Sequence, residues 1–328
     1  MENVILVPLD GSPASESAVE VAIAIAHTVG GTVELAHVHG IPRFLSGTAP
    51  QDPALDLDEA EHMREPIAAL AQRATEEHGV RVTAQLLLGP AASMLARHAA
   101  ERTVRLIVMT THGRGGLSRA WLGSVADRLV RQGTAPVLLV RPGGGPTAPD
   151  WPPTRVLVPL DGSPLAEEVL APLAGLIDAS DGVDLVLLYV VEPLPPLDPF
   201  PDVAVLVDRA GTSGAQDTAN AHSAEAAQAY LDGVAASLLR QSIRAQTHVA
   251  VHESPARAIL EYADESQADL IALATHGRGG LERVLLGSVA DKVIRGTTAS
   301  VLVVRPTPSP AAVPAEPNRE SRVPPHGS

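Results

Sequence analysis

The chain contains no cysteine, so it can form no disulfide, no cysteine-ligated metal site and no thiol nucleophile. Lysine is almost absent too, because Lys292 is the single lysine in 328 residues. The phosphate-binding loop of many ATPases ends in a lysine followed by Ser or Thr, whereas Lys292 is followed by Val293. That class of nucleotide hydrolase is therefore excluded.

Aromatic residues make up only 2% of the chain, while apolar residues make up 45%. The cores must therefore be built from Ala, Val, Leu and Ile, a composition that suits parallel strands buried on both faces. The formal net charge of −14 disfavours extensive contact with a phosphate backbone, so nucleic acid is not an expected partner.

Long apolar runs are absent as well. None approaches the roughly 20 residues needed to cross a bilayer, and Met1 leads almost directly into an apolar strand without a basic region or a cleavage site. We therefore expect a cytoplasmic protein with no membrane partner.

What the chain does contain is a repeat. The stretch VILVPLDGSP, which begins at Val4, returns as VLVPLDGSP at Val156, so that Asp10 corresponds to Asp161 and the offset is 151 residues. The 32 residues from Thr111 align with those from Thr275, with an offset of 164, and 22 of the 32 positions are identical. A period of this length corresponds to a whole domain. The sequence therefore predicts a duplicated domain.

The two offsets differ by 13 residues (164 − 151), so the second copy carries an insertion between the matched blocks. We place it in the proline-rich stretch that begins at Glu192. Glycine and proline between the copies indicate a linker, and the segment after Arg305 lacks apolar periodicity and is expected to be disordered. The predicted units are a domain at 1–142, a linker at 143–153, a domain at 154–306 and a tail at 307–328.

Each copy alternates short apolar runs with longer segments of helical periodicity. In the first copy we expect strands at Val4–Leu9, Thr32–His39, Val80–Leu88, Arg105–Thr110 and Ala135–Val140, separated by helices at Ser12–Val29, Leu55–His78, Gly89–Glu101 and Leu122–Arg131. The second copy repeats this order, and its first helix is expected as one element over Leu165–Ile177. The alternation predicts an α/β fold of two tandem, doubly wound, five-stranded parallel sheets of Rossmann-like type.

Ligands of open α/β sheets bind beyond the carboxyl ends of the strands, where the strand order reverses. Two loops with unusual residues are expected there: one begins with Asp10 after the first strand, and the other follows the fourth strand, carries THGRGG and ends at Gly123 and Ser124. Glycines let backbone N–H groups approach an anion, and a helix start adds the positive end of its dipole. The sequence thus predicts a phosphate cradle. Its further members are Asp161, Gly287 and Ser288 in the second copy, with added charge from Arg114, Arg119, Arg278 and Arg283.

Both features have a plainer explanation. Glycines also serve in tight strand-to-helix turns, and an Asp before Gly-Ser-Pro is a common residue at a helix start, so capping and ligand contact stay open for Asp10. The recurrence of the glycine pattern in both copies favours phosphate binding. A dinucleotide fingerprint is excluded because its glycines would follow the first strand rather than the fourth.

These motifs resemble universal stress protein domains. The resemblance rests on VPLDGSP, on the His-Val or Tyr-Val pair at the end of the second strand, on THGRGGL and LGSVA, and on the closing VLLVRP. It covers nearly all of Asn3–Arg141 and Arg155–Arg305 and implies a strand order of 3-2-1-4-5.

Members of that family that bind ATP carry G-x-x-G, nine further residues, then Gly followed by Ser or Thr. Here the first glycine of the motif is replaced by Thr110 and by Ala274, and the β-branched Thr110 is expected to crowd a nucleotide. The sites are therefore predicted to differ in affinity. The candidate residues that the resemblance implies are Pro8, Asp10, Val38, Thr110, His112, Gly113, Arg114, Gly115, Gly116, Gly123, Ser124 and Val125 in the first copy, and Pro159, Asp161, Val190, Ala274, His276, Gly277, Arg278, Gly279, Gly280, Gly287, Ser288 and Val289 in the second.

The resemblance implies ATP as the ligand, with ADP, AMP and an accompanying Mg²⁺ as alternatives, and no catalytic residue. It also implies contact between the last strands of the two copies, as a pseudo-dimer within one chain, and the same strands could join two chains in a homodimer. His37 and His39 alternate on a strand, but Tyr189 and Val191 replace them in the second copy, so a shared metal site is not expected.

Three functions remain open at this point. The first is a regulator that binds ATP and acts through conformation, assembly or an unknown protein partner. The second is an interaction protein of the same fold that needs no nucleotide. The third is a slow ATPase, against which stands the lack of an evident general base.

Overall fold

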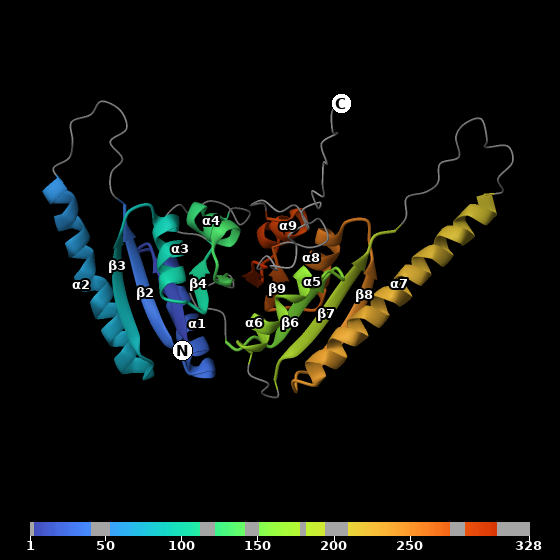
Figure 1. Ribbon diagram of the computed structural model, residues 1–328, viewed down its shortest axis with the longest axis horizontal. Helices are drawn as coiled ribbons and strands as arrows, with labels where there is room; N and C mark the ends of the chain where they lie inside the picture. The colour runs from blue at the N-terminus through green and yellow to red at the C-terminus, as the bar shows by residue number, and fades with distance from the viewer. Residues whose placement is uncertain are drawn as a thin grey trace, which may run out of the picture.

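The computed structural model describes residues 3–40, 53–111, 122–141, 151–177, 182–193, 209–275 and 286–306, with side chains described for all of these except 53–61 and 209–217. Most of the predicted linker, the predicted tail and most of the proline-rich insertion lie outside the described residues. The two copies stand side by side in Figure 1, with their outermost helices at opposite ends of the molecule.

The first copy has the expected alternation. Its elements are β1 (Val4–Leu9), α1 (Pro13–Val29), β2 (Thr32–His39), α2 (Pro53–His78), β3 (Val82–Leu88), α3 (Ala91–Glu101), β4 (Leu106–Thr110), α4 (Ser124–Gln132) and β5 (Val137–Val140).

Local sequence sets the bounds of α1. The Ser12 side chain accepts a hydrogen bond from the Ser15 amide, Pro13 occupies the first helical position, and Gly30 ends the helix at φ 63° and ψ 49°, a left-handed conformation that glycine adopts without strain.

The second copy repeats the order with one difference. Its elements are β6 (Arg155–Leu160), α5 (Pro164–Glu167), α6 (Leu170–Ala174), β7 (Asp184–Val191), α7 (Arg209–Leu239), β8 (Ala245–Val251), α8 (Pro255–Glu265), β9 (Leu270–Ala274), α9 (Ser288–Gly296) and β10 (Ser300–Val304). The prediction of one helix over Leu165–Ile177 is wrong, because the helix breaks between α5 and α6. Pro172 explains the break: it has no N–H to donate to the carbonyl of Glu168, and its ring crowds that carbonyl.

The strands form a single sheet of ten, in the order β3-β2-β1-β4-β5-β10-β9-β6-β7-β8. Each half therefore has the predicted order 3-2-1-4-5, and the α/β class is confirmed. The detail that differs is the continuity: β5 and β10, each at the edge of its own half, pair antiparallel in the middle through Leu138↔Leu302 and the pairs on either side of it. The predicted pairing of the last strands within one chain is confirmed.

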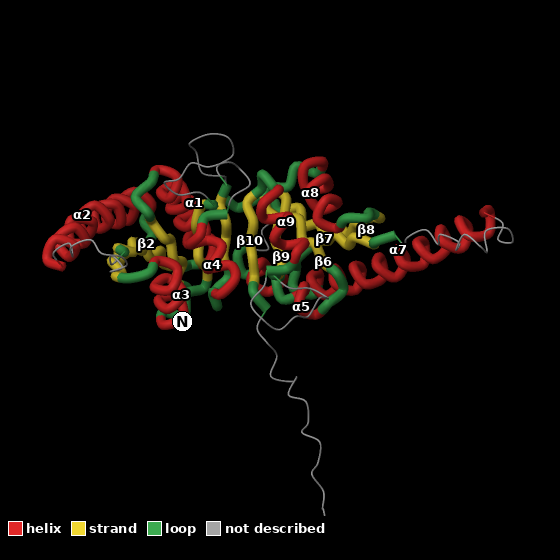
Figure 2. Tube along the Cα trace, turned by 90° about the horizontal axis from the view of Figure 1, so that it is seen from above, coloured by secondary structure: helices red, strands yellow, loops and turns green. Residues whose placement is uncertain are grey.

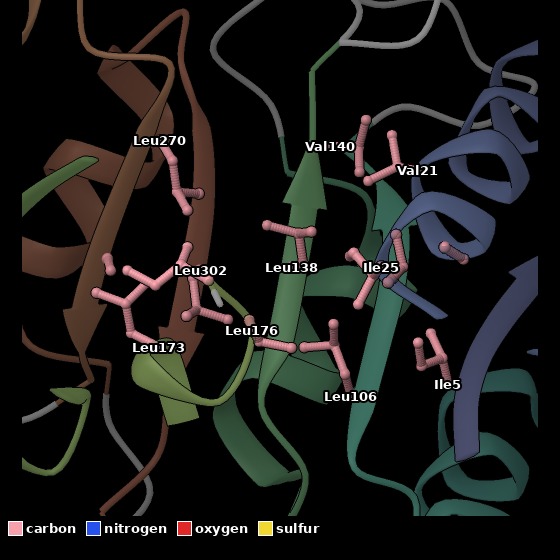
Figure 3. Packing of buried hydrophobic residues seen from close by; sticks show 14 of the residues in the cluster. Ile5, Val21, Ile25, Leu106, Leu138, Val140, Leu173, Leu176, Leu270 and Leu302 are labelled. Atoms are coloured by element: carbon pink, nitrogen blue, oxygen red, sulfur yellow. The ribbon is translucent and has the colours of Figure 1, made fainter. Parts of the chain in front are cut away.

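Helices cover both faces of this sheet (Figure 2). One apolar core lies beneath α1, α2, α5, α6 and α7 and runs through both halves without interruption. The other lies beneath α3, α4, α8 and α9. Figure 3 shows the first core at the junction, where Leu138, Leu302 and Leu176 pack together. The halves thus share their interior.

Candidate functional site

The strand order reverses beside β1, because β1 pairs with β2 on one side and with β4 on the other. The chain leaves β1 toward α1 on one face of the sheet and approaches α4, after β4, on the opposite face. The carboxyl ends of β1 and β4 therefore lie at the point where open α/β sheets receive ligands, and we call this position the crevice. The second half repeats this arrangement with β6, β7 and β9.

The first loop of the site is held by its own aspartate. The Asp10 carboxylate accepts hydrogen bonds from the Ser12 amide at 3.0 Å and from the Ser12 hydroxyl at 2.6 Å. Ser12, not Asp10, caps α1, so Asp10 acts one step earlier by orienting the capping serine. Asp161 does the same for Ser163 in the second half, at 2.9 and 2.6 Å.

The second loop closes with a backbone hydrogen bond. The Gly123 amide donates to the Thr111 carbonyl at 3.1 Å, and the Gly287 amide donates to the Thr275 carbonyl at 2.8 Å. The chain therefore returns to the end of β4, or of β9, immediately before the next helix begins. The predicted site residues His112, Gly113, Arg114, Gly115, Gly116, His276, Gly277, Arg278, Gly279 and Gly280 lie outside the described residues, as do Arg119 and Arg283.

Helices α4 and α9 begin at this point without a side-chain cap, because their N-cap residues are Gly123 and Gly287. The following residues, Ser124 and Ser288, are exposed. Helices α3 and α8 also start without a side-chain cap. The start of α4 nevertheless differs from that of α3, because α4 follows β4, the strand that pairs with β1. Its first N–H groups and the positive end of its dipole thus face the crevice.

The two N-cap glycines have different structural roles. Their φ angles are −56° and −58°, which any residue can adopt, so neither glycine is required by backbone conformation. A Cβ on Gly123 would have the Thr111 carbonyl oxygen as its near neighbour, at an ordinary 3.5 Å. A Cβ on Gly287 would lie 2.9 Å from the Thr275 oxygen. Packing explains the glycine in the second half, whereas no described neighbour explains the glycine in the first.

An apolar surface lies beside the start of α4. Leu6 belongs to the core on the α4 side, and strand alternation places Pro8 on that same face. Val38 and Val125 pack against this core, and all three side chains remain partly exposed although two of them belong to interior strands. Pro159, Val190 and Val289 have the corresponding positions in the second half. The crevice thus combines an apolar wall with an uncapped helix start.

Thr110 occupies the last position of β4 and is 8% exposed. Leu106 and Val108, four and two residues earlier, belong to the core on the α1 side, so alternation directs Thr110 toward that face and away from α4. The same alternation applies to Ala274 after Leu270 and Ala272. This placement therefore does not support the expectation that Thr110 crowds a nucleotide.

The second half places a tyrosine within electrostatic reach of Asp161, which the sequence did not suggest. The Tyr230 hydroxyl donates to Glu167 at 2.9 Å, and its ring meets Tyr189 edge-on at 5.9 Å. Burial raises the pKa of Tyr230, and the hydrogen bond to Glu167 and the charges of Glu167 and Asp161 raise it further. No sequence signal marks Tyr230, because it lies on the long helix α7.

The first half has different groups at this place. The His37 ring, which corresponds to Tyr189, forms a hydrogen bond through Nδ1 with the Leu9 carbonyl at 2.9 Å. Among the residues whose side chains are described, no group of three or more His, Asp or Glu residues could hold a metal ion. The two crevices therefore share their backbone frame and differ in the side chains near the end of the second strand.

No helix in the described part of the chain combines the length and the apolar character that crossing a membrane requires.

Comparison with known proteins agrees with this architecture. A universal stress protein of Mycolicibacterium smegmatis is 31% identical over 317 residues, which cover 92% of this chain and 97% of that protein. A universal stress protein of Mycobacterium tuberculosis is 31% identical over 335 residues, covering 95% and 97%. A universal stress protein of Archaeoglobus fulgidus has a crystal structure with the same fold, at a TM-score of 0.65, 19% identity, and coverage of 93% and 99%.

The model of the universal stress protein family matches this chain twice, at residues 1–141 and 153–305. The chain belongs to the universal stress protein family, as a member with two tandem domains.

Proposed function

We propose that each half binds one adenine nucleotide, and that this nucleotide is ATP. The nucleotide would lie in the crevice between the ends of β1 and β4 in the first half and of β6 and β9 in the second. The phosphates would lie against the uncapped starts of α4 and α9, and the adenosine would lie on the apolar wall. Nucleotide occupancy would then regulate conformation or assembly.

The observation that carries this proposal is that no described residue requires a glycine at position 123. The residue has an ordinary φ of −56°, and a Cβ there would meet the Thr111 oxygen at an unstrained 3.5 Å. A residue chosen only to cap α4 would be Ser, Asp or Asn. An approaching phosphate would explain the glycine, since a residue without a Cβ lets an anion come close to the backbone N–H groups of a helix start.

The test is titration of ATP, with and without Mg²⁺, into the full chain and into Ser124→Asp, Ser288→Asp and the double variant. Asp in the first turn stabilises a helix through its dipole, so folding is retained while the added charge repels phosphate. At an effective dielectric constant near 20, a carboxylate about 5 Å away weakens binding by tenfold or more.

The full chain should bind two equivalents, each single variant one, and the double variant none. Ser254→Asp is the matched control: it changes the same residue type at the start of α8, which follows the edge strand β8, and should still bind two. Absence of binding at millimolar ATP in the full chain would refute the proposal and favour an interaction protein that needs no nucleotide. Hydrolysis far above background would instead identify a slow ATPase.

A further inference from the structure

Helices α4 and α9 lie on the same face of the sheet, on either side of its middle (Figures 1 and 2). They carry a ring of four charges that joins the two halves. Arg131 donates from Nε to Asp127 at 2.9 Å and from Nη2 to Asp291 at 3.3 Å. Arg295 donates from Nε to Asp291 at 3.0 Å and from Nη2 to Asp127 at 3.4 Å. We call these four residues the interdomain quartet.

The quartet is symmetric and electrically neutral. Each arginine pairs once within its own helix, four residues away, and once with the aspartate of the other half. The four side chains are 25% to 33% exposed, so each pair alone contributes little to stability, and the network fixes geometry more than it adds free energy.

Each aspartate of the quartet is also bonded to its nucleotide crevice. The Asp127 amide donates to the Gly123 carbonyl at 2.8 Å, and the Asp291 amide donates to the Gly287 carbonyl at 2.9 Å. A continuous series of hydrogen bonds therefore runs from Gly123 through Asp127, Arg295 and Asp291 to Gly287.

The charges of the interdomain quartet also link the two helix starts. Asp127 lies in the first turn of α4, where its carboxylate repels an anion bound at that helix start. Arg295, which comes from the other half, neutralises this carboxylate, and Arg131 does the same for Asp291 in the second half. Each aspartate is thus neutralised by one arginine of its own half and by one that the opposite domain supplies.

We propose that the interdomain quartet couples the two crevices, so that a nucleotide in one raises the affinity of the other. This inference rests on the proposed function. A nucleotide that holds α4 in place also places Arg131 on Asp291 and so orders α9 for the second nucleotide. A partly exposed network transmits a coupling near the lower end of the usual range, about fivefold in affinity.

The test compares two ways of releasing nucleotide from the full chain filled with labelled ATP. Dilution into buffer leaves the neighbouring site empty after the first release, whereas dilution into excess unlabelled ATP refills it. The first labelled ATP leaves at the same rate in both cases, because its neighbour is still filled. If the sites are coupled, the second labelled ATP leaves about fivefold faster into buffer than into excess ATP, whereas independent sites release it at the same rate.

The variant Arg131→Gln/Arg295→Gln removes both ion pairs that the described residues form between the halves and should bring the ratio of the two rates to one. Asp127→Asn/Asp291→Asn removes the same pairs from the other side and should do likewise. The matched control is Arg257→Gln, which removes a pair of 2.7 Å with Glu261 inside α8 and should leave the ratio unchanged. If the quartet had only a structural role, both variants would lower the melting temperature and leave the ratio of the two release rates unchanged.

The outcomes separate this inference from the function beneath it. If no labelled ATP is retained by the full chain, the proposed function fails. If ATP is retained and both release rates are equal, the function stands and the coupling is refuted. A ratio that persists in both quartet variants would show that coupling runs through the sheet instead, and would also overturn the inference.

Discussion

The contrast between Gly123 and Gly287 gives a test in which the molecule provides its own control. Both residues begin equivalent helices at nearly the same φ, yet a Cβ would lie 3.5 Å from backbone oxygen in one case and 2.9 Å in the other. Atoms at 2.9 Å overlap, and the neighbour is backbone, so the helix start or the end of β9 must shift. Overpacking of this kind costs about 1–3 kcal/mol.

Gly123→Ala has two opposing effects, and its Cβ clashes with no residue that the structure describes. Restricting the unfolded chain stabilises by about 0.4–1 kcal/mol, and replacing glycine by the poorer N-cap alanine removes a similar amount. We expect the stability of Gly123→Ala to stay within about 1 kcal/mol of the wild type. Gly287→Ala should lose about 1–3 kcal/mol, which corresponds to a fall of roughly 2–12 °C in melting temperature for a domain of this size.

The assay is thermal unfolding followed by far-ultraviolet circular dichroism, without nucleotide. Gly233→Ala is the reference for a helpful change, because Gly233 lies inside α7 and nothing lies within 4 Å of its Cβ position, so alanine should raise the melting temperature. Equal melting temperatures for Gly123→Ala and Gly287→Ala would refute the reasoning, since the close approach at Gly287 would then have no energetic consequence.

Three further changes test the description of the fold. Burial acts to raise the pKa of Asp269, but hydrogen bonds from Thr154 and neighbouring backbone outweigh it and lower that pKa. The carboxylate therefore stabilises the fold above about pH 4, and this contribution is lost on acidification. The free energy of urea unfolding of Asp269→Asn should depend less on pH between about 5 and 2 than that of the wild type. Tyr230→Phe removes the hydrogen bond to Glu167 and should cost about 1 kcal/mol in the same assay at pH 7. Because the pKa of Tyr230 is raised in the folded protein, the wild type should lose stability above about pH 10, where the tyrosine of the unfolded chain ionises, and Tyr230→Phe should not. An unchanged alkaline profile would contradict this. Leu302→Ala, at a fully buried position of the shared core, should cost about 2–5 kcal/mol and shift a single calorimetric transition, whereas two separate transitions would show that the halves unfold independently.

Most of the architecture could be predicted from the sequence, because the alternation of short apolar runs with helical periodicity is a local property. The bounds of α1 illustrate this: Ser12, Pro13 and Gly30 each act within a few residues. The break between α5 and α6 was missed although Pro172 lies inside the predicted helix. The apolar periodicity continues across that proline, whereas the backbone cannot.

The site could be predicted only in part. The position of both crevices follows from strand order, and the start of α4 follows from Gly123 and Ser124. The loop residues between Thr111 and Leu122 stay predictions. The quartet could not be foreseen, because Asp127 and Arg131 show only their spacing within one helix, while their partners depend on how β5 and β10 pair.

The pairing of β5 with β10 inside one polypeptide has a genetic consequence. In a dimer of identical subunits every mutation appears in both subunits, so neither site can change alone. Here the two sites are encoded separately while the contact between them is kept. His37 in one half and Tyr189 in the other show that the two copies have already diverged at this place. Covalent linkage thus turns a symmetric assembly into one whose halves are free to specialise.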